Sequence, residues 1–266
     1  MKLRLVPASQ GLHWVRQGLR ITRMQPLGFI GLLGMVLASA LLLAGLPVVG
    51  PLIVVAAMPT IWMGFMLATR RVILGERAMP SVLIEALRGP EAPRAALLQL
   101  GGAYVLATLA VMTLAQWLGP GSDALGEAMD ASKDAGEVLS DPLVLQDMLW
   151  RMGLSLPVSL LFWHTPALVL WGRLSVGKAL FFSAVASWRN LGAFTVYGLG
   201  WAGILLALGL LDRLIHSVLG VPALTNMLAV VIGMAVAAAF YASLYFTVVD
   251  CFEAPKQPGS DDDPVA

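Results

Sequence analysis

The sequence predicts an all-α, polytopic transmembrane helix bundle with six spans, cytoplasmic N- and C-termini and short interfacial helices. First, 58% of the 266 residues are hydrophobic and only 12% are charged, about half the charged fraction of a typical soluble domain. Second, the apolar residues form long blocks, and a helix needs about 20 such residues to cross a bilayer. Third, the basic residues fall on one side of these blocks. Together these features exclude a soluble globular enzyme.

A single transmembrane domain is expected over residues 1–253. Its six spans are predicted at residues 27–46, 52–69, 95–118, 152–172, 191–211 and 227–249. Short interfacial helices are expected near Ser81–Leu87 and over Ser175–Asn190, and a short loop over Asp212–Pro222. Residues 254–266 are rich in Pro, Gly, Ser and Asp, a composition that predicts a disordered acidic tail.

The orientation follows from the Lys and Arg count, because cytoplasmic loops are enriched in these residues. With both ends inside, the outer segments hold three basic residues: Lys133, Arg151 and Arg213. The other 14 are cytoplasmic, which is 17 minus these three. Multi-pass insertion in the cytoplasmic membrane is therefore predicted, with membrane lipids as the first partners and no nucleic acid.

The first 26 residues are polar and basic, and two interpretations stay open for them. Leu12, Val15, Leu19 and Thr22 recur at helical spacing, with Arg16 and Arg20 in a separate row. That pattern is typical of a helix lying on the anionic cytoplasmic leaflet before the chain turns in at Pro26. Equally, these charges are the ordinary positive flank of a first span.

His164 is the candidate intramembrane polar residue, predicted near the middle of the fourth span with Thr165 beside it and Ser159 five residues earlier. An ionisable side chain at membrane depth is a functional hypothesis by default, because its charged form is costly there. The alternative is a neutral histidine hydrogen-bonded to a neighbouring helix. Pro157 and Pro166 flank it, so a binding cavity is one hypothesis; prolines also occur in spans without such a role.

A second candidate is an ion pair at the cytoplasmic interface. Arg189 precedes the fifth span and Asp250 ends the sixth, so the two side chains are predicted to tie these helix ends together. Such exposed pairs are more often structural than functional.

Motifs for catalysis and metal binding are missing from the sequence. The chain has one cysteine and three histidines, and the histidines fall at different levels of the predicted bundle. It lacks a His-Glu-x-x-His motif, a Gly-x-Ser-x-Gly turn and a phosphate-binding glycine loop. We therefore expect no catalytic residue, no metal site and no cofactor.

Several short elements resemble an uncharacterised family of bacterial six-helix inner-membrane proteins known only by a locus-tag name. They are Gly11-x-x-Trp14-x-x-x-Gly18 with Pro26, Thr165-Pro166-Ala167-Leu168-Val169, Ser187-Trp188-Arg189-Asn190-Leu191 with Tyr197-Gly198, and Tyr241-Ala242-Ser243 with Asp250-x-Phe252. In the family the aspartate follows the Tyr-x-Ser element more closely. The resemblance implies the six-helix fold and supplies no activity.

The leading functional hypothesis is a non-enzymatic accessory or scaffold protein, with a membrane-protein partner or a homo-oligomer as its assembly. Small residues such as Gly198, Ala202, Gly233 and Ala237 favour close helix association. The alternative is a small permease or lipid-handling protein with a cavity near Pro157, His164 and Pro166. The third functional hypothesis is an intramembrane enzyme.

Overall fold

The computed structural model describes residues 2–88, 92–131, 138, 141–219 and 222–253. Six helical segments are long and apolar enough to cross a membrane, as predicted. They are α2 (Pro26–Ala44), α3 (Val49–Ile73), α4 (Arg94–Leu118), α7 (Pro142–Phe162) continued by α8 (Thr165–Leu170), α10 (Leu191–Leu219) and α11 (Pro222–Cys251). The predicted tail over residues 254–266 lies outside the described residues.

The remaining elements are short: β1 (Lys2–Leu3), α1 (Gln10–Met24), the 3₁₀ helix η1 (Pro80–Leu87), α5 (Ser122–Ala131), α9 (Val176–Arg189) and β2 (Phe252–Glu253). The two strands pair antiparallel, with Lys2 opposite Glu253 and Leu3 opposite Phe252. The beginning and end of the described chain therefore meet on one side of the molecule. An even number of spans likewise places both ends on the same side of the membrane.

The fourth span begins ten residues earlier than predicted, at Pro142 rather than at residue 152. Asp141 caps this helix, because its carboxylate accepts a hydrogen bond of 2.8 Å from the Leu143 amide. Pro142 suits the first helical position, where no amide hydrogen is needed. The acidic side chains that precede residue 152 in the sequence obscured this start.

The predicted loop at Asp212–Pro222 is largely helical. Helix α10 continues to Leu219, and α11 already begins at Pro222. Both helices hold about 30 residues, so each is longer than the roughly 20 residues that a bilayer core requires. The polar residues of the predicted loop therefore form additional helical turns at the end of α10 and the beginning of α11, beyond the apolar blocks from which the spans were predicted.

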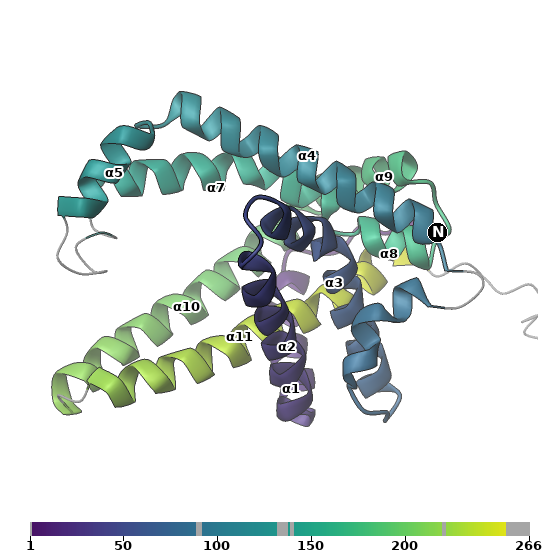
Figure 1. Ribbon diagram of the computed structural model, residues 1–266. Helices are drawn as coiled ribbons and strands as arrows, with labels where there is room; N and C mark the ends of the chain where they lie inside the picture. Colours follow the sequence, from purple (N-terminus) through teal and green to yellow (C-terminus); the bar gives the residue numbers. More distant parts are fainter. Residues whose placement is uncertain (1, 89–91, 132–137, 139–140, 220–221, 254–266) are drawn as a thin grey trace, which may run out of the picture.

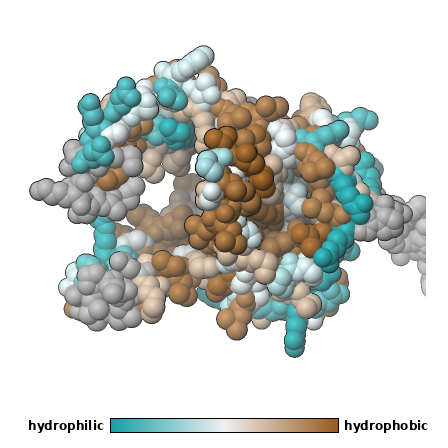
Figure 2. Space-filling model, viewed as in Figure 1, coloured by the Kyte–Doolittle hydropathy of each residue, from teal (hydrophilic) through white to brown (hydrophobic). Residues whose placement is uncertain are grey.

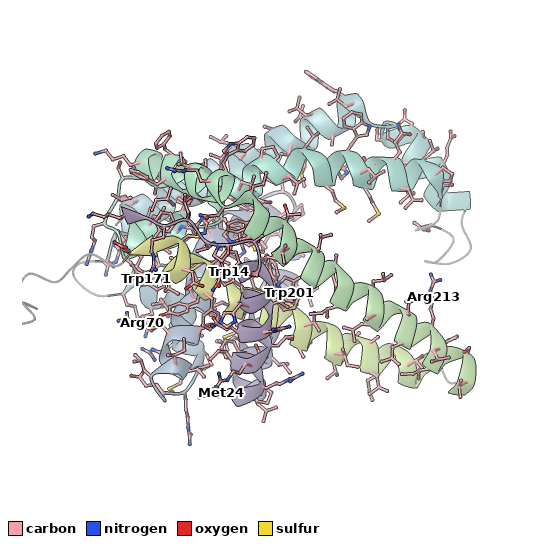
Figure 3. The ribbon with its side chains drawn as sticks, turned by 180° about the vertical axis from the view of Figure 1, so that it is seen from behind. Trp14, Met24, Arg70, Trp171, Trp201 and Arg213 are labelled. Atoms are coloured by element: carbon pink, nitrogen blue, oxygen red, sulfur yellow. The ribbon has the colours of Figure 1, made fainter. Side chains whose placement is uncertain are left out.

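Helix α1 packs between α10 and α11, and its glycines make this contact possible. A Cβ on Gly11 would clash with the Ala193 carbonyl, and one on Gly18 would lie 2.6 Å from the Ser243 Cβ. Trp14 is fully buried on the same face. Figure 3 shows α1 crossing the molecule from Trp14 to Met24. The buried face of α1 is therefore centred on its glycines and Trp14. It is rotated about the helix axis from the row of Leu12, Val15, Leu19 and Thr22 that the sequence indicated.

Two helical hairpins diverge from a common base (Figure 1). We call α1, α8, α9, the two strands and the adjoining ends of α10 and α11 the base. One hairpin consists of α4 and α7, with α5 near its tip; the other consists of α10 and α11. Figure 2 shows open space between the two hairpins and a strongly hydrophobic surface beside it. The molecule is thus a splayed bundle.

The connector between α3 and α4 packs onto α3 through η1. Val82 is fully buried, and a Cβ on Gly64 would lie 2.9 Å from the Leu83 Cα atom. Arg71, in the last turns of α3, forms an ion pair of 2.8 Å with Glu85 of η1. The expected short interfacial helix is therefore held against the span that precedes it.

Candidate functional site

His164 lies at a break between α7 and α8, in the base of the molecule. Its ring stands edge-on to Phe194 in the first turn of α10, with centroids 5.6 Å apart, and to Phe252 of β2, at 5.3 Å. The sequence predicts a position near the middle of the fourth span, and this stays a prediction. His164 follows the helix start at Pro142 by 22 residues, about 33 Å of helix.

Proline chemistry explains the break, and polar side chains compensate for it. Pro166 has no amide hydrogen to donate to the carbonyl four residues earlier, so the helix is interrupted before it. Ser183 of α9 accepts a hydrogen bond of 3.0 Å from the His164 amide and donates one of 3.0 Å to the Leu160 carbonyl. Thr165 donates to the Leu161 carbonyl at 2.7 Å. The His164 amide and the Leu160 and Leu161 carbonyls thereby have hydrogen-bond partners at the break.

The imidazole of His164 is fully enclosed. Its exposed fraction is zero, and neither ring nitrogen has a hydrogen-bond partner among the described residues. The Thr247 backbone lies near the ring without meeting hydrogen-bond geometry. The Thr247 hydroxyl instead accepts a hydrogen bond of 3.1 Å from Trp163. A charged imidazole would be strongly disfavoured here, so the ring acts as an aromatic packing group.

The three residues of the predicted polar site do not converge. Thr165 is buried next to His164 and donates to the Leu161 carbonyl of α7, whereas Ser159 is half-buried one turn earlier. Within the described chain no hydrogen bond joins Ser159 to His164. This arrangement lacks the nucleophile–base contact that covalent catalysis needs.

Asp250 is held by two side chains of α1. Its Oδ2 atom accepts hydrogen bonds from Gln10 Nε2 at 2.6 Å and from Trp14 Nε1 at 2.7 Å. Arg189 is exposed, and the described residues show no ion pair between it and Asp250. The predicted pair is thus not formed. Helix α1 supplies two neutral donors to the carboxylate, and hydrogen bonds to a carboxylate are stronger than neutral ones.

Asn190, which follows Arg189 in the sequence, forms hydrogen bonds with the N-terminal segment. Its Oδ1 accepts from the Val6 amide at 2.9 Å, and its Nδ2 donates to the Arg4 carbonyl at 3.1 Å. Sequence reasoning missed Gln10, Trp14 and Asn190 as connecting residues. The signal that marks them is the pair Gly11 and Gly18, because glycines seven apart lie on one helix face and permit close helix approach.

A cavity of about 770 Å³ lies away from His164, between α2, α3, η1 and α4. Its lining is apolar except for the hydroxyl groups of Ser39, Thr60 and Ser81. The crossing of α4 over α3 at this cavity is close, because a Cβ on Gly101 would clash with the Ala56 carbonyl. Such a cavity suits a hydrocarbon chain and offers no titratable group for chemistry. Among the described residues no group of three or more His, Cys, Asp or Glu side chains comes together to hold a metal ion.

Comparison with known proteins gives one informative relative. A protein of Burkholderia thailandensis described as a "probable inner membrane protein", known by a locus tag, is 35% identical over 271 residues. The match covers 98% of this chain and all of the relative. The chain belongs to the same family of inner-membrane proteins. No family model matches the chain, and no solved structure matches it.

The family and the six apolar helices establish an integral, multi-pass protein of the bacterial inner membrane. The resemblance found in the sequence is thereby confirmed. The relative's description assigns no activity, so the function must be argued from the geometry.

Proposed function

We propose that the protein is a non-enzymatic accessory or scaffold subunit that holds a membrane-protein partner between its two hairpins. The observation that carries this proposal is the divergence of the α4–α7 hairpin from the α10–α11 hairpin (Figure 1). A bundle that acts alone buries its helices against one another, whereas the described residues of these hairpins come together only at the base. The space between them is wide enough to be seen in Figure 2.

The low burial of the hairpin helices supports this proposal. Only 17% of the apolar window of α4 and 17% of that of α10 is buried inside the molecule. Leu106 of α4 and Leu206 of α10 are 70% and 66% exposed. Helices in membranes associate through van der Waals packing of such surfaces rather than through exclusion of water. Partner helices would therefore add contacts that this chain does not supply itself.

Native mass spectrometry of the protein extracted in its own lipid tests the proposal. The expected result is a second polypeptide at fixed stoichiometry, either a different membrane protein or a second copy. A photo-crosslinking residue placed at Leu106 or Leu206 is expected to capture that polypeptide. The control places the same photo-crosslinking residue at Leu42. This residue is 80% exposed and lies on α2, which belongs to neither hairpin. The proposal is contradicted if mass spectrometry finds the chain alone and the photo-crosslinking residue captures only lipid at Leu106, Leu206 and Leu42.

A second candidate, a lipid-handling protein, is favoured by the apolar cavity between α2, α3, η1 and α4. In this case the purified chain retains one lipid without a partner protein. The variant Ala57→Phe narrows the cavity and is expected to release that lipid. Ala110→Phe adds the same volume at an exposed position of α4 and is expected to retain it. Equal lipid retention in both variants contradicts this candidate.

A further inference from the structure

Helix α1 carries three arginines on the face opposite its buried glycines. Arg16, Arg20 and Arg23 are all exposed, and they recur at steps of four and three residues, which places them in one row. Together with Leu19 and Met24 they line a hollow of about 400 Å³. The described residues form no ion pair with any of the three. Three like charges around one hollow repel one another unless an anion lies between them.

Both ends of α1 are fixed to the cytoplasmic side of the molecule. At its start, Gln10 and Trp14 bind Asp250 at the end of α11. After its last residue, Gln25 donates to the Glu76 carbonyl at 2.7 Å and accepts from the Ala78 amide at 2.9 Å, just beyond the end of α3. The distribution of basic residues places both anchors inside. Helix α1 therefore runs along the cytoplasmic boundary of the membrane, at the level of the lipid headgroups.

We propose that Arg16, Arg20 and Arg23 form a binding site for the phosphate headgroup of an anionic phospholipid. Guanidinium groups match phosphate oxygens with two parallel hydrogen bonds each, and basic clusters at the cytoplasmic boundary attract anionic lipids. Next to the hollow, Met24 and Leu27 are 58% and 86% exposed. Their side chains continue the site toward the bilayer and offer apolar contact to the acyl chains of the same lipid. The headgroup chemistry and the adjacent apolar surface together identify a lipid rather than a free phosphate ion.

The test is a binding titration on the purified full chain in a neutral detergent. The probes are short-chain phosphatidylglycerol, phosphatidylcholine with the same chains, and inorganic phosphate. Removing one arginine at such a boundary weakens binding by about five-fold, so R16Q/R20Q/R23Q is expected to lose roughly 100-fold in affinity for phosphatidylglycerol. The matched control K178Q/R189Q/R213Q removes three exposed positive charges elsewhere and is expected to stay within about two-fold of the parent chain.

A second variant separates charge from geometry. R16K/R20K/R23K keeps the charge and loses the two-pronged hydrogen bonding, so an affinity between those of the parent chain and the glutamine variant is expected. Equal losses in the glutamine variant and its control would overturn the proposal, because net charge alone would then explain binding. Equal affinity for phosphatidylcholine, or displacement of phosphatidylglycerol by millimolar phosphate, would overturn the lipid assignment. The outcome is independent of the scaffold role, since it needs no partner protein.

Discussion

The base and the two hairpins are built on different principles. In the base, hydrogen bonds connect residues that are 184 and 240 positions apart, Val6 with Asn190 and Gln10 with Asp250. In the α10–α11 hairpin, two helices that follow each other in the sequence lie side by side. The base therefore depends on specific polar and glycine contacts between distant segments, whereas the hairpin depends on apolar surface that lipid or protein can cover.

This difference locates the stability of the isolated chain in the base and in the buried core of α2 and α3 beside it, rather than in the outer parts of the hairpins. Trp14 is fully enclosed and contacts Phe194 and Tyr197, with ring centroids 5.3 and 5.9 Å apart. The outer parts of the hairpins have no equivalent cluster among the described residues. Substitutions in the base should therefore change the free energy of unfolding strongly, and substitutions on the hairpin surfaces should change it little.

The largest effect is expected for Gly18→Leu. The added side chain would meet the Ala239 carbonyl and the Ser243 side chain, so α1 would be displaced from α11. Overpacking of this kind costs about 3 kcal/mol or more in free energy of unfolding. Thermal unfolding in detergent measures it. The control is Gly198→Leu on α10, where a Cβ has open space; equal losses at the two glycines would contradict the packing of α1.

A loss of about 2 kcal/mol is expected for Trp14→Phe, which removes one of the two donors to Asp250 and leaves a ring in place. A double-mutant cycle with Asp250→Asn isolates this interaction. The two losses should be less than additive, because both changes remove the same charge-assisted hydrogen bond. Strict additivity would show that Trp14 contributes by packing alone.

His164→Leu is expected to be neutral or to stabilise the fold by up to about 1 kcal/mol. The substitution removes two fully buried ring nitrogens that lack partners among the described residues. Ser183→Ala is the contrasting variant in the same cluster: it should destabilise the fold, because the His164 amide and Leu160 carbonyl lose their partner. Unfolding midpoints of the two variants should therefore move in different directions. A strongly destabilising His164→Leu would indicate a polar role for the ring.

The smallest effect is expected for Leu206→Ala on the exposed face of α10, at most about 0.5 kcal/mol. Helix propensity changes little and no buried contact is lost. The same unfolding measurement checks this value. A loss above 1 kcal/mol would mean that the two hairpins close on each other in the absence of a partner.

The sequence predicted the six-helix class and both chain ends on one side of the membrane, because long apolar blocks and an even span number determine both. It did not predict that the two ends pair as β1 and β2. For α1 it left two interpretations open, a helix on the cytoplasmic leaflet and a positive flank. It did not predict the packing of α1 against α10 and α11, because Gly11 and Gly18 carry no hydropathy signal. The partners of Asp250 were missed for the same reason. The start of α7 was missed because span four was started by hydropathy alone, although the Asp141-Pro142 start signal was present.

The distance between the hairpin tips tests the central claim most directly. Spin labels at Ser122→Cys on α5 and Ser217→Cys on α10, in a Cys251→Ser background, report this distance in lipid nanodiscs by pulsed electron spin resonance. Both serines are exposed. The splayed arrangement predicts a separation well beyond the about 8–10 Å between the axes of packed helices. A short, narrow distance typical of neighbouring helices would show a closed bundle and contradict a partner site between the hairpins.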